Sequence, residues 1–278
     1  MLGAIIGDIV GSRFEFVDDI LRPKNFALFT PSCRPTDDSF MTLAVAEALL
    51  LSKGDQECLQ RQVISSMKKI AHKHPKTGWG AHFYRWLFEE NNPKPYNSYG
   101  NGAGMRISPV GWVAESEEEV KALSKTVTEV SHNHPEGLKG AEAIALAVYL
   151  ARIGNSKDEI RERMQEYYPK LNDKNFTIKN IHGKYGYDDD GKWVTCQGSI
   201  PQALIAFLDS ENFEDAIRNA VCIGGDSDTI GAMAGSIAEA YYGVSYEMEE
   251  KALTYLSGDL ISTYYAFETI KKKRIKQH

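Results

Sequence analysis

Cysteine is scarce in this sequence, and the spacing of its cysteines indicates neither a disulfide framework nor a structural zinc site. The 278 residues include four cysteines, and no two of them form a C-x-x-C pair or a zinc-like spacing. They are Cys33, Cys58, Cys196 and Cys222. Disulfide-stapled domains and structural zinc sites both need closely spaced cysteines, so the sequence argues against these two classes. We expect reduced thiols in the core or at the surface.

Long hydrophobic runs are also missing, and the first residues do not show the pattern of a secretory leader. The longest mostly apolar stretch, AEAIALAVYLA, is shorter than the ~20 residues that a transmembrane helix needs. The first residues, MLGAIIGDIVGSRFEF, contain no basic leader and no small-residue cleavage site, and Asp8 interrupts their apolar run. We therefore expect no membrane segment and a protein that stays in the cytoplasm.

The chain has no excess of positive charge. It carries 32 lysine and arginine side chains against 38 aspartate and glutamate side chains, for a formal net charge of −6. A surface that neutralises nucleic-acid phosphates is rich in cations, and no stripe of alternating aromatic and basic residues compensates here. The composition therefore argues against general nucleic-acid binding.

Strand-like patterns are weak, whereas apolar residues recur at helical spacing along most of the chain. This periodicity predicts helices over about residues 2–11, 37–52, 55–73, 78–89, 116–131, 138–153, 156–168, 199–209, 213–222, 227–242, 247–257 and 259–272. The exception is NFTIKNIHGKYGYDDDGKWV, where glycines and an aspartate-rich turn break short β-like runs. We expect a compact all-α bundle with one irregular or hairpin-like insertion near residues 172–195.

The length allows one large domain or two tightly packed lobes. No segment looks like a linker, so we expect a single domain over residues 1–278. Glycines recur every fourth residue at Gly3, Gly7 and Gly11, and again at Gly231 and Gly235. Because this spacing places them on one face of each helix, it predicts two helices that pack closely at the molecular centre.

Two of the expected helices begin with paired carboxylates next to a hydroxyl residue. The segments are PTDDSFMTLAVAEALLLS and GGDSDTIGAMAGSIAEAYYG, and their opening side chains are Thr36, Asp37, Asp38, Asp226, Asp228 and Thr229. Helix capping explains one such segment, because threonine is a good N-cap and acids in the first turn favour the helix dipole. Two such segments, neither with a lysine or arginine to neutralise the acids, favour a different explanation.

Buried carboxylates need positive partners, and divalent cations can supply them. Hard ions such as Mg²⁺ bind carboxylate, hydroxyl and water oxygens. Paired aspartates from two helix starts could therefore hold two Mg²⁺ ions, with Mn²⁺ as an alternative of the same octahedral geometry. The sequence thus predicts a dinuclear site where the two helix starts meet.

Three further segments contain candidate binding groups. Glu15 lies just beyond the first glycine-rich helix, where a loop could bring it toward the metal site. The segment NSYGNGAGMR offers hydroxyl and amide side chains among glycines, whose backbone amides a phosphate can approach closely. In VSHNHPEG, hydrogen bonding to a ligand or a plain loop role suits His132 and His134 better than zinc binding.

In this combination and order, the motifs resemble those of the ADP-ribosylglycohydrolase family, which includes the dinitrogenase reductase-activating glycohydrolases. The matching segments run through nearly the whole chain: GAIIGDIVGSRFE, PTDDS, YGNGAGMR, VSHNHPEGLKGAEAIALAVYLA, CQGSIPQALIAFLDS and IGGDSDTIGAMAGSIAEAYYG. The resemblance implies the compact orthogonal helical bundle of that family. It also implies cleavage of the glycosidic bond between ADP-ribose and an arginine nitrogen, a serine oxygen or a related acceptor.

The resemblance also implies roles for individual residues. The metal-binding residues would be Thr36, Asp37, Asp38, Asp226, Asp228 and Thr229, and the residues that contact the substrate diphosphate would be Ser98, Tyr99, Gly100, Asn101 and Gly102. Glu15 matches the acid on the family's loop over the reacting ribose. His132 matches the histidine of a T-H motif, although Ser131 stands in the place of the threonine. The residues between Asn172 and Val194 match no family motif.

The chemistry of these residues agrees with that reaction. Two metal ions can fix a ribose through its hydroxyls and polarise a water for attack at the anomeric carbon. Asp37 or Asp226 would hold metal and accept the proton of the water, while Glu15 would orient the water or assist the leaving group. We expect a monomer that acts on an ADP-ribosylated protein or small molecule, whose acceptor the sequence does not identify.

Two other functional classes stay open at this point. The fold also occurs in lens crystallins, so a non-catalytic binding or structural protein is one alternative, although all the matched ligands are present here. A metal-dependent hydrolase of another nucleotide bond, such as a phosphoester, would use the same pair of ions. Free ADP-ribose as the product would separate the glycosidic reaction from both.

Overall fold

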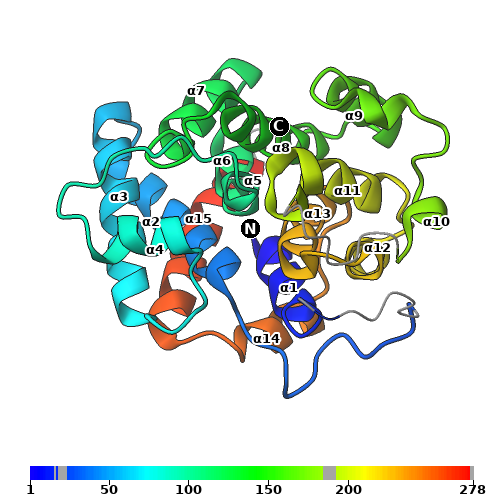
Figure 1. Ribbon diagram of the computed structural model, residues 1–278, viewed down its shortest axis with the longest axis horizontal. Helices are drawn as coiled ribbons and strands as arrows, with labels where there is room; N and C mark the ends of the chain where they lie inside the picture. The colour runs from blue at the N-terminus through cyan, green and yellow to red at the C-terminus, as the bar shows by residue number, and fades with distance from the viewer. Residues whose placement is uncertain (16, 18–23, 184–191, 276–278) are drawn as a thin grey trace.

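The computed structural model describes residues 1–15, 17, 24–183 and 192–275. Within these residues the chain is helical, and the only β-type pairing is an isolated bridge between Gly100 and Thr195. The helices, labelled as in Figure 1, are α1 (Leu2–Gly11), α2 (Asp37–Ser52), α3 (Gln56–Lys73), α4 (Ala81–Phe88), α5 (Gly102–Met105), α6 (Ser108–Val113), α7 (Glu117–Thr128), α8 (Pro135–Arg152), α9 (Lys157–Gln165), α10 (Ile178–Ile181), α11 (Cys196–Leu208), α12 (Phe213–Ile223), α13 (Ser227–Tyr242), α14 (Tyr246–Leu253) and α15 (Gly258–Ile275). Two 3-10 turns, η1 (Pro169–Asn172) and η2 (Lys192–Val194), complete the described elements. The all-α prediction is confirmed.

Most helices begin and end within a few residues of the positions that periodicity predicts. Helix α8 starts three residues earlier than expected, because Pro135 suits the first turn and the His134 side chain accepts a hydrogen bond from the Glu136 amide. Helix α11 also starts earlier, where Thr195 caps it by accepting from the Gly198 amide at 3.1 Å. The short helices α5 and α6 were not predicted, since each is too brief to show a period.

The stretch near residues 172–195 is the irregular part of the fold. Its described residues form one-turn elements only, namely the end of η1, the four-residue α10 and the three-residue η2. The aspartate-rich turn expected in this stretch falls within residues 184–191, which lie outside the described residues. Where the structure describes it, the insertion takes the irregular rather than the hairpin-like form.

Helices α1 and α13 lie side by side at the centre of the molecule (Figure 1). All ten residues of α1 are buried. A Cβ atom on Gly7 would lie 2.0 Å from the carbonyl oxygen of Gly231, and one on Gly3 would lie 2.0 Å from that of Gly235. Only glycine lets two helix backbones approach so closely. The close packing predicted from the glycine spacing is confirmed.

The other helices surround this central pair. Helices α8, α11 and α12 pack against α13, and α2 packs against α1 while contacting α3 and α15. In Figure 1, α2, α3 and α4 occupy one side of the pair and α9 to α12 the other. No two of the four cysteines form a disulfide in the structure. Among the described residues, no helix is long and apolar enough to cross a membrane.

A buried ion cluster joins α15 to the central pair. The carboxylate of Glu239 in α13 accepts hydrogen bonds from the Gly3 amide at 2.8 Å and from Lys271 Nζ in α15 at 2.5 Å. The α-ammonium of Met1 lies 2.5 Å from the same carboxylate. Burial alone would raise the pKa of Glu239, but the two cations lower it to about 2. Burial lowers the pKa of the Met1 amine to about 6, so Lys271 is the partner that keeps its charge at neutral pH.

Candidate active site

The starts of α2 and α13 meet beside the end of α1. Gly11, the last residue of α1, is so close to α13 that a Cβ there would lie 2.5 Å from the Cα of Asp228. The turn before α13 contains Gly224 and Gly225, whose φ angles of 90° and 69° suit glycine. These two glycines let the chain turn out of α12, so that Asp226 and Asp228 stand at the start of α13.

A carboxylate from α1 holds the start of α2. Asp8 accepts hydrogen bonds from the Thr36 amide at 2.9 Å, from Thr36 Oγ1 at 2.7 Å and from the Ser39 amide at 3.0 Å. Thr36 also caps the helix by accepting from the Asp38 amide, at 3.4 Å. The capping explanation is therefore correct for Thr36, but it leaves the aspartates unexplained.

The second helix start is tied to the first and to the glycine-rich segment. Thr229 Oγ1 donates to Asp38 Oδ2 at 3.2 Å, which links α13 to α2. Asn101 Nδ2 donates to Asp226 Oδ2 at 2.6 Å, which links the segment before α5 to α13. The side chain of Asp226 makes no capping hydrogen bond to its own helix. Its carboxylate therefore belongs to the site and not to the helix end.

Five carboxylates gather here in two groups with the spacing of metal ligands. One oxygen from each of Asp8, Asp38 and Asp228 lies within 4.8 Å of the other two, and the same holds for Glu15, Asp226 and Asp228. Asp228 belongs to both groups. All of these residues are buried except Glu15, which is partly buried.

Asp37, the first residue of α2, belongs to neither group but lines the same cleft. Burial and then the charges of Asp8 and Asp226 raise its pKa to about 8. Burial, followed by the charges of neighbouring carboxylates, also raises the pKa of Glu15 to about 7 and places those of Asp38 and Asp228 well above their usual range. The site therefore concentrates negative charge that it does not neutralise by itself.

The residues present fit a divalent cation. In the part of the chain that the structure describes, no lysine or arginine forms an ion pair with these carboxylates. Oδ1 of Asp38 is buried and has no hydrogen-bond partner. A bound cation would satisfy that oxygen and reverse the pKa shifts. Carboxylate and hydroxyl oxygens are also the donors that hard cations prefer.

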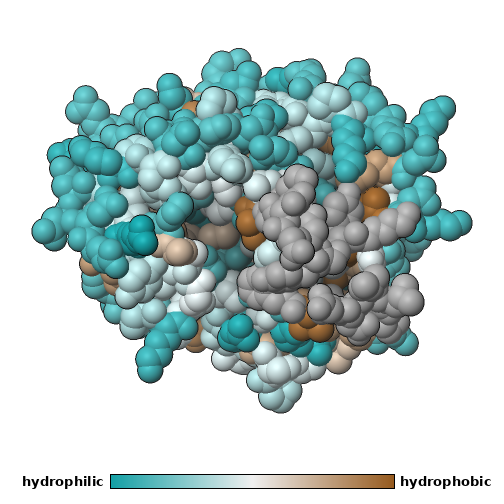
Figure 2. All heavy atoms as spheres, in the orientation of Figure 1, coloured by the Kyte–Doolittle hydropathy of each residue, from teal (hydrophilic) through white to brown (hydrophobic). Residues whose placement is uncertain are grey.

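All of these carboxylates except Asp8 line a cleft with a volume of about 450 Å³. The face of the molecule seen in Figure 2 is hollowed near its centre. The lining of the cleft also includes the start of α4 and side chains or backbone of Ser98, Gly100, Asn101 and Gly102, together with His132. The structure thus brings the acidic residues and most of the predicted substrate-binding residues to one place.

Tyr99 is the exception among the predicted substrate-binding residues. Its side chain is 46% exposed and is not among the residues that line the cleft. Its ring centre lies 5.1 Å from that of His134, so the two rings pack at the rim of the glycine-rich segment. Alternation along an extended segment explains this placement, because the neighbours Ser98 and Gly100 both face the cleft.

Nearly the whole chain matches one family model, described as ADP-ribosylglycohydrolase, over residues 1–266. The chain belongs to the ADP-ribosylglycohydrolase family. ADP-ribosylhydrolase ARH3 of Homo sapiens is 25% identical over 315 residues, which cover 88% of this chain and 84% of the relative. ADP-ribosylarginine hydrolase Tri1 of Pseudomonas putida is 27% identical over 281 residues, with 88% of this chain and 70% of the relative covered.

A solved structure described as an "ADP-ribosylglycohydrolase-related protein complex" has a similar fold. The TM-score is 0.57 and the sequence identity 22%, and the match covers 99% of this chain and 95% of that chain. At this identity the likeness concerns the fold alone. It agrees with the helical bundle described above.

Two residues of this candidate site were not identified from the sequence. Asp8 appeared only as a break in an apolar run, although a carboxylate inside a glycine-ridged helix is itself a signal of a buried polar contact. Arg106, at the end of the glycine-rich segment, is fully buried and donates from Nη2 to Ser131 Oγ at 2.7 Å and to His132 Nδ1 at 3.2 Å. Its partners are distant in sequence, so no local pattern shows them.

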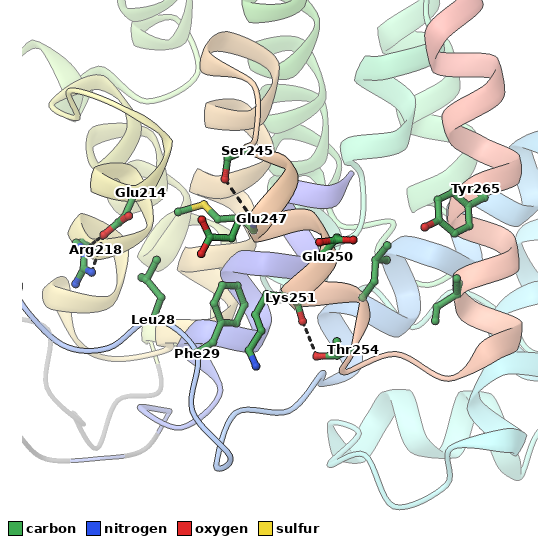
Figure 3. Close-up of a pocket in the computed structure, with 13 residues that line it drawn as sticks. Leu28, Phe29, Glu214, Arg218, Ser245, Glu247, Glu250, Lys251, Thr254 and Tyr265 are labelled. Carbon is green, nitrogen blue, oxygen red and sulfur yellow. Dashed lines mark hydrogen bonds and ion pairs between the residues drawn. The ribbon is translucent and has the colours of Figure 1, made fainter.

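A second cavity among the described residues is larger than this candidate site. A more open cavity of about 1080 Å³ lies along α14, between the loop at Phe29 and Tyr265 of α15 (Figure 3). Its charges are mixed and partly paired, as in the ion pair of 2.6 Å between Arg218 and Glu214. Every member of the two carboxylate groups except Asp8 lines the smaller cleft.

Proposed function

We propose that this protein hydrolyses the glycosidic bond between ADP-ribose and an acceptor, with two divalent cations, Mg²⁺ or Mn²⁺, as cofactors. One observation carries the proposal: the members of two overlapping carboxylate groups, all except Asp8, line a cleft together with a glycine-rich segment, and one oxygen of Asp38 is buried without a partner. The names of the relatives support the reaction, because both describe hydrolysis of an ADP-ribosyl bond.

The cleft offers separate places for the parts of the substrate. The metal ligands we propose are Thr36, Asp37, Asp38, Asp226, Asp228 and Thr229. The groups that receive the diphosphate are Ser98, Gly100, Asn101, Gly102 and His132, with Tyr99 at the rim of the same segment. Backbone amides beside glycines can approach phosphate oxygens closely, and the acidic wall is then left to the ribose.

In the reaction, a water oxygen attacks the anomeric carbon, and the bond from that carbon to the acceptor nitrogen or oxygen breaks. The cations, when bound, would fix the ribose hydroxyls and acidify the water. Asp226 accepts the proton of the water, because Asn101 orients its carboxylate through the 2.6 Å hydrogen bond. Asp37, which lines the same cleft, is the alternative base. Glu15 delivers a proton to the leaving acceptor from its position beside Asp226 and Asp228.

The reaction and the acceptor can be tested together. The purified protein is incubated with Mg²⁺ and with ADP-ribosyl-arginine or ADP-ribosyl-serine peptides, and free ADP-ribose is followed by mass spectrometry with an EDTA control. Metal-dependent release from either peptide supports the proposal and identifies the acceptor. Release of phosphate in place of ADP-ribose would point to phosphoester hydrolysis, and binding of ADP-ribose without turnover of any peptide would point to a non-catalytic protein.

Three variants separate the roles of the acids. Asp228→Ala should abolish both metal binding and hydrolysis, because it removes the ligand shared by the two groups. Glu15→Ala should keep metal and ADP-ribose binding but lose rate. Glu247→Ala, an exposed acid on α14 outside the cleft, is the matched control and should leave hydrolysis unchanged. Full activity in Asp228→Ala would refute the two-metal proposal.

A further inference from the structure

A buried triangle of polar groups lies behind the cleft. Arg106 Nη2 donates to Ser131 Oγ at 2.7 Å and to His132 Nδ1 at 3.2 Å, and Ser131 Oγ lies 2.9 Å from the same Nδ1. Arg106 and Ser131 are fully buried, and His132 is 5% exposed. Such a group of contacts in the interior fixes the ring orientation of the histidine.

The chemistry of the triangle decides which ring nitrogen carries the proton. A guanidinium can only donate hydrogen bonds. Since the Ser131 hydroxyl oxygen accepts from Arg106, its own proton is directed to the nearest acceptor, which is His132 Nδ1. Both neighbours of Nδ1 are therefore donors, and Nδ1 is the unprotonated nitrogen. The proton of the neutral ring must then be on Nε2.

Electrostatics keeps the ring neutral while its arginine neighbour stays charged. Burial, followed by the charge of Arg106, lowers the pKa of His132 well below its usual value. Burial also lowers the pKa of Arg106, but only to about 10. At neutral pH the pair is therefore a guanidinium cation next to a neutral imidazole.

The protonated nitrogen faces the glycine-rich segment. A Cβ atom on Gly102 would lie 3.3 Å from His132 Nε2, and one on Gly100 would lie 3.6 Å from it. His132 lines the cleft, and its hydrogen bonds to described residues involve only the Nδ1 side of the ring and the backbone. The Nε2–H group therefore has space in front of it and no acceptor among the described residues.

We infer that Arg106 and Ser131 are positioning residues that hold His132 as its Nε2–H tautomer, so that it donates a hydrogen bond to a phosphate oxygen of ADP-ribose beside Gly100 and Gly102. The identity of this ligand rests on the proposed function. The tautomer itself follows from the hydrogen bonds alone. The neutral His132 ring is held in place before the ligand binds, so its Nε2–H group can recognise a phosphate oxygen in one direction. Arg106 remains the cation of the pair, and no further positive charge is needed at the glycine-rich segment.

The wild-type protein can test the tautomer directly. In ¹⁵N-labelled protein, long-range ¹H–¹⁵N correlation spectra distinguish an unprotonated Nδ1 from an unprotonated Nε2, and His132→Gln identifies the signals among the seven histidines. We expect an unprotonated Nδ1 in the free protein and a change in the Nε2 shift when ADP-ribose is added. An Nδ1–H tautomer or an imidazolium at neutral pH would overturn the inference.

Matched variants test the positioning role. Without the guanidinium, the Ser131 hydroxyl can accept a hydrogen bond from His132 Nδ1 as readily as donate one to it, so Arg106→Met should populate the Nδ1–H tautomer. Arg106→Lys keeps a cation that can only donate, so it should keep the wild-type spectrum. His132→Gln retains an N–H group and should bind ADP-ribose, while His132→Leu should bind it about tenfold more weakly, as expected for one lost hydrogen bond.

The outcomes distinguish this inference from the proposed function. A merely structural triangle would lower the melting temperature of Arg106→Met without changing the tautomer, and that result would refute the positioning role. If the wild-type protein bound no ADP-ribose, the proposed function would fail, and the ligand-facing role of Nε2 with it. If ADP-ribose bound to a protein whose His132 carried its proton on Nδ1, only this inference would fail.

Discussion

Replacing Gly7 with alanine should force α1 away from α13. The added Cβ would lie 2.0 Å from the Gly231 oxygen, 2.2 Å from the Gly231 carbonyl carbon and 2.7 Å from the Ala232 nitrogen. All three are backbone atoms, so no side-chain rotation can relieve the contact. An ordinary contact of 3.4 Å to the oxygen would require the two helices to separate by about 1.4 Å at this point.

Two opposing effects set the size of the change in stability. Alanine is favoured over glycine inside a helix by about 0.5–1 kcal/mol. Overpacking of a core costs about 1–3 kcal/mol, and a clash between two backbones belongs at the upper end of that range. The net loss should therefore be about 2 kcal/mol or more, which lowers the melting temperature of a chain of this size by roughly 4–8 °C.

Urea unfolding of Gly7→Ala and Gly258→Ala, compared with the wild type, measures this difference. Gly258, the first residue of α15, is the matched control because a Cβ there meets nothing within 4 Å. Its alanine variant should be as stable as the wild type or slightly more stable. Since Asp8 follows Gly7 directly, the displacement should also weaken Mg²⁺ binding. A Gly7→Ala protein as stable as Gly258→Ala would refute the close backbone contact.

Three other outcomes follow. Asp8→Asn should weaken Mg²⁺ binding, because an amide offers one acceptor oxygen where the carboxylate accepts from both Thr36 and Ser39 and so holds the start of α2; an unchanged dissociation constant for Mg²⁺ would contradict this. The pKa of Glu239 is about 2 in the folded protein against an ordinary 4.5, which corresponds to a stabilisation of about 3 kcal/mol. This stabilisation is present above pH ~4.5 and is lost as the pH falls toward 2. Glu239→Gln should therefore flatten the stability curve that urea unfolding measures between pH 2 and 5. Mg²⁺ at about a hundred times its dissociation constant should add about 3 kcal/mol to wild-type stability in thermal unfolding and nothing to Asp228→Asn; a rise in both proteins would mean that the ion binds elsewhere.

The sequence was sufficient for features that local pattern determines. Helical periodicity located most of the helices, and the four-residue spacing of glycines identified α1 and α13 as the close-packed pair. The paired aspartates could be recognised because both helix starts repeat one local arrangement. The placement of Asp37, Asp38, Asp226 and Asp228 around one cleft agrees with that expectation.

Features that depend on contacts between distant segments were not predictable in this way. Asp8 acts on α2 across 28 residues, and Arg106 acts on Ser131 across 25 residues. A pattern in one sequence describes only the spacing of residues within a segment. It can therefore identify side chains that donate or accept hydrogen bonds, but not the partners that other segments bring to them. The outward placement of Tyr99 has the same cause, because the backbone path of the glycine-rich segment is set by its bridge to Thr195.

The glycine ridge and the acidic site depend on each other. Helices with ordinary side chains at their contact lie about 8–10 Å apart, whereas the glycines allow direct backbone contact between α1 and α13. This approach brings an oxygen of Asp8 within 4.8 Å of oxygens of Asp38 and Asp228, at which distance like charges repel strongly in a buried site. In the metal-free protein, the packing energy of the helix pair must offset that repulsion. A bound cation would remove the repulsion and so return the stability that it costs. The same close packing that costs stability without metal therefore preorganises the carboxylates that we propose as metal ligands, so we expect glycines that never touch the ion to influence metal affinity.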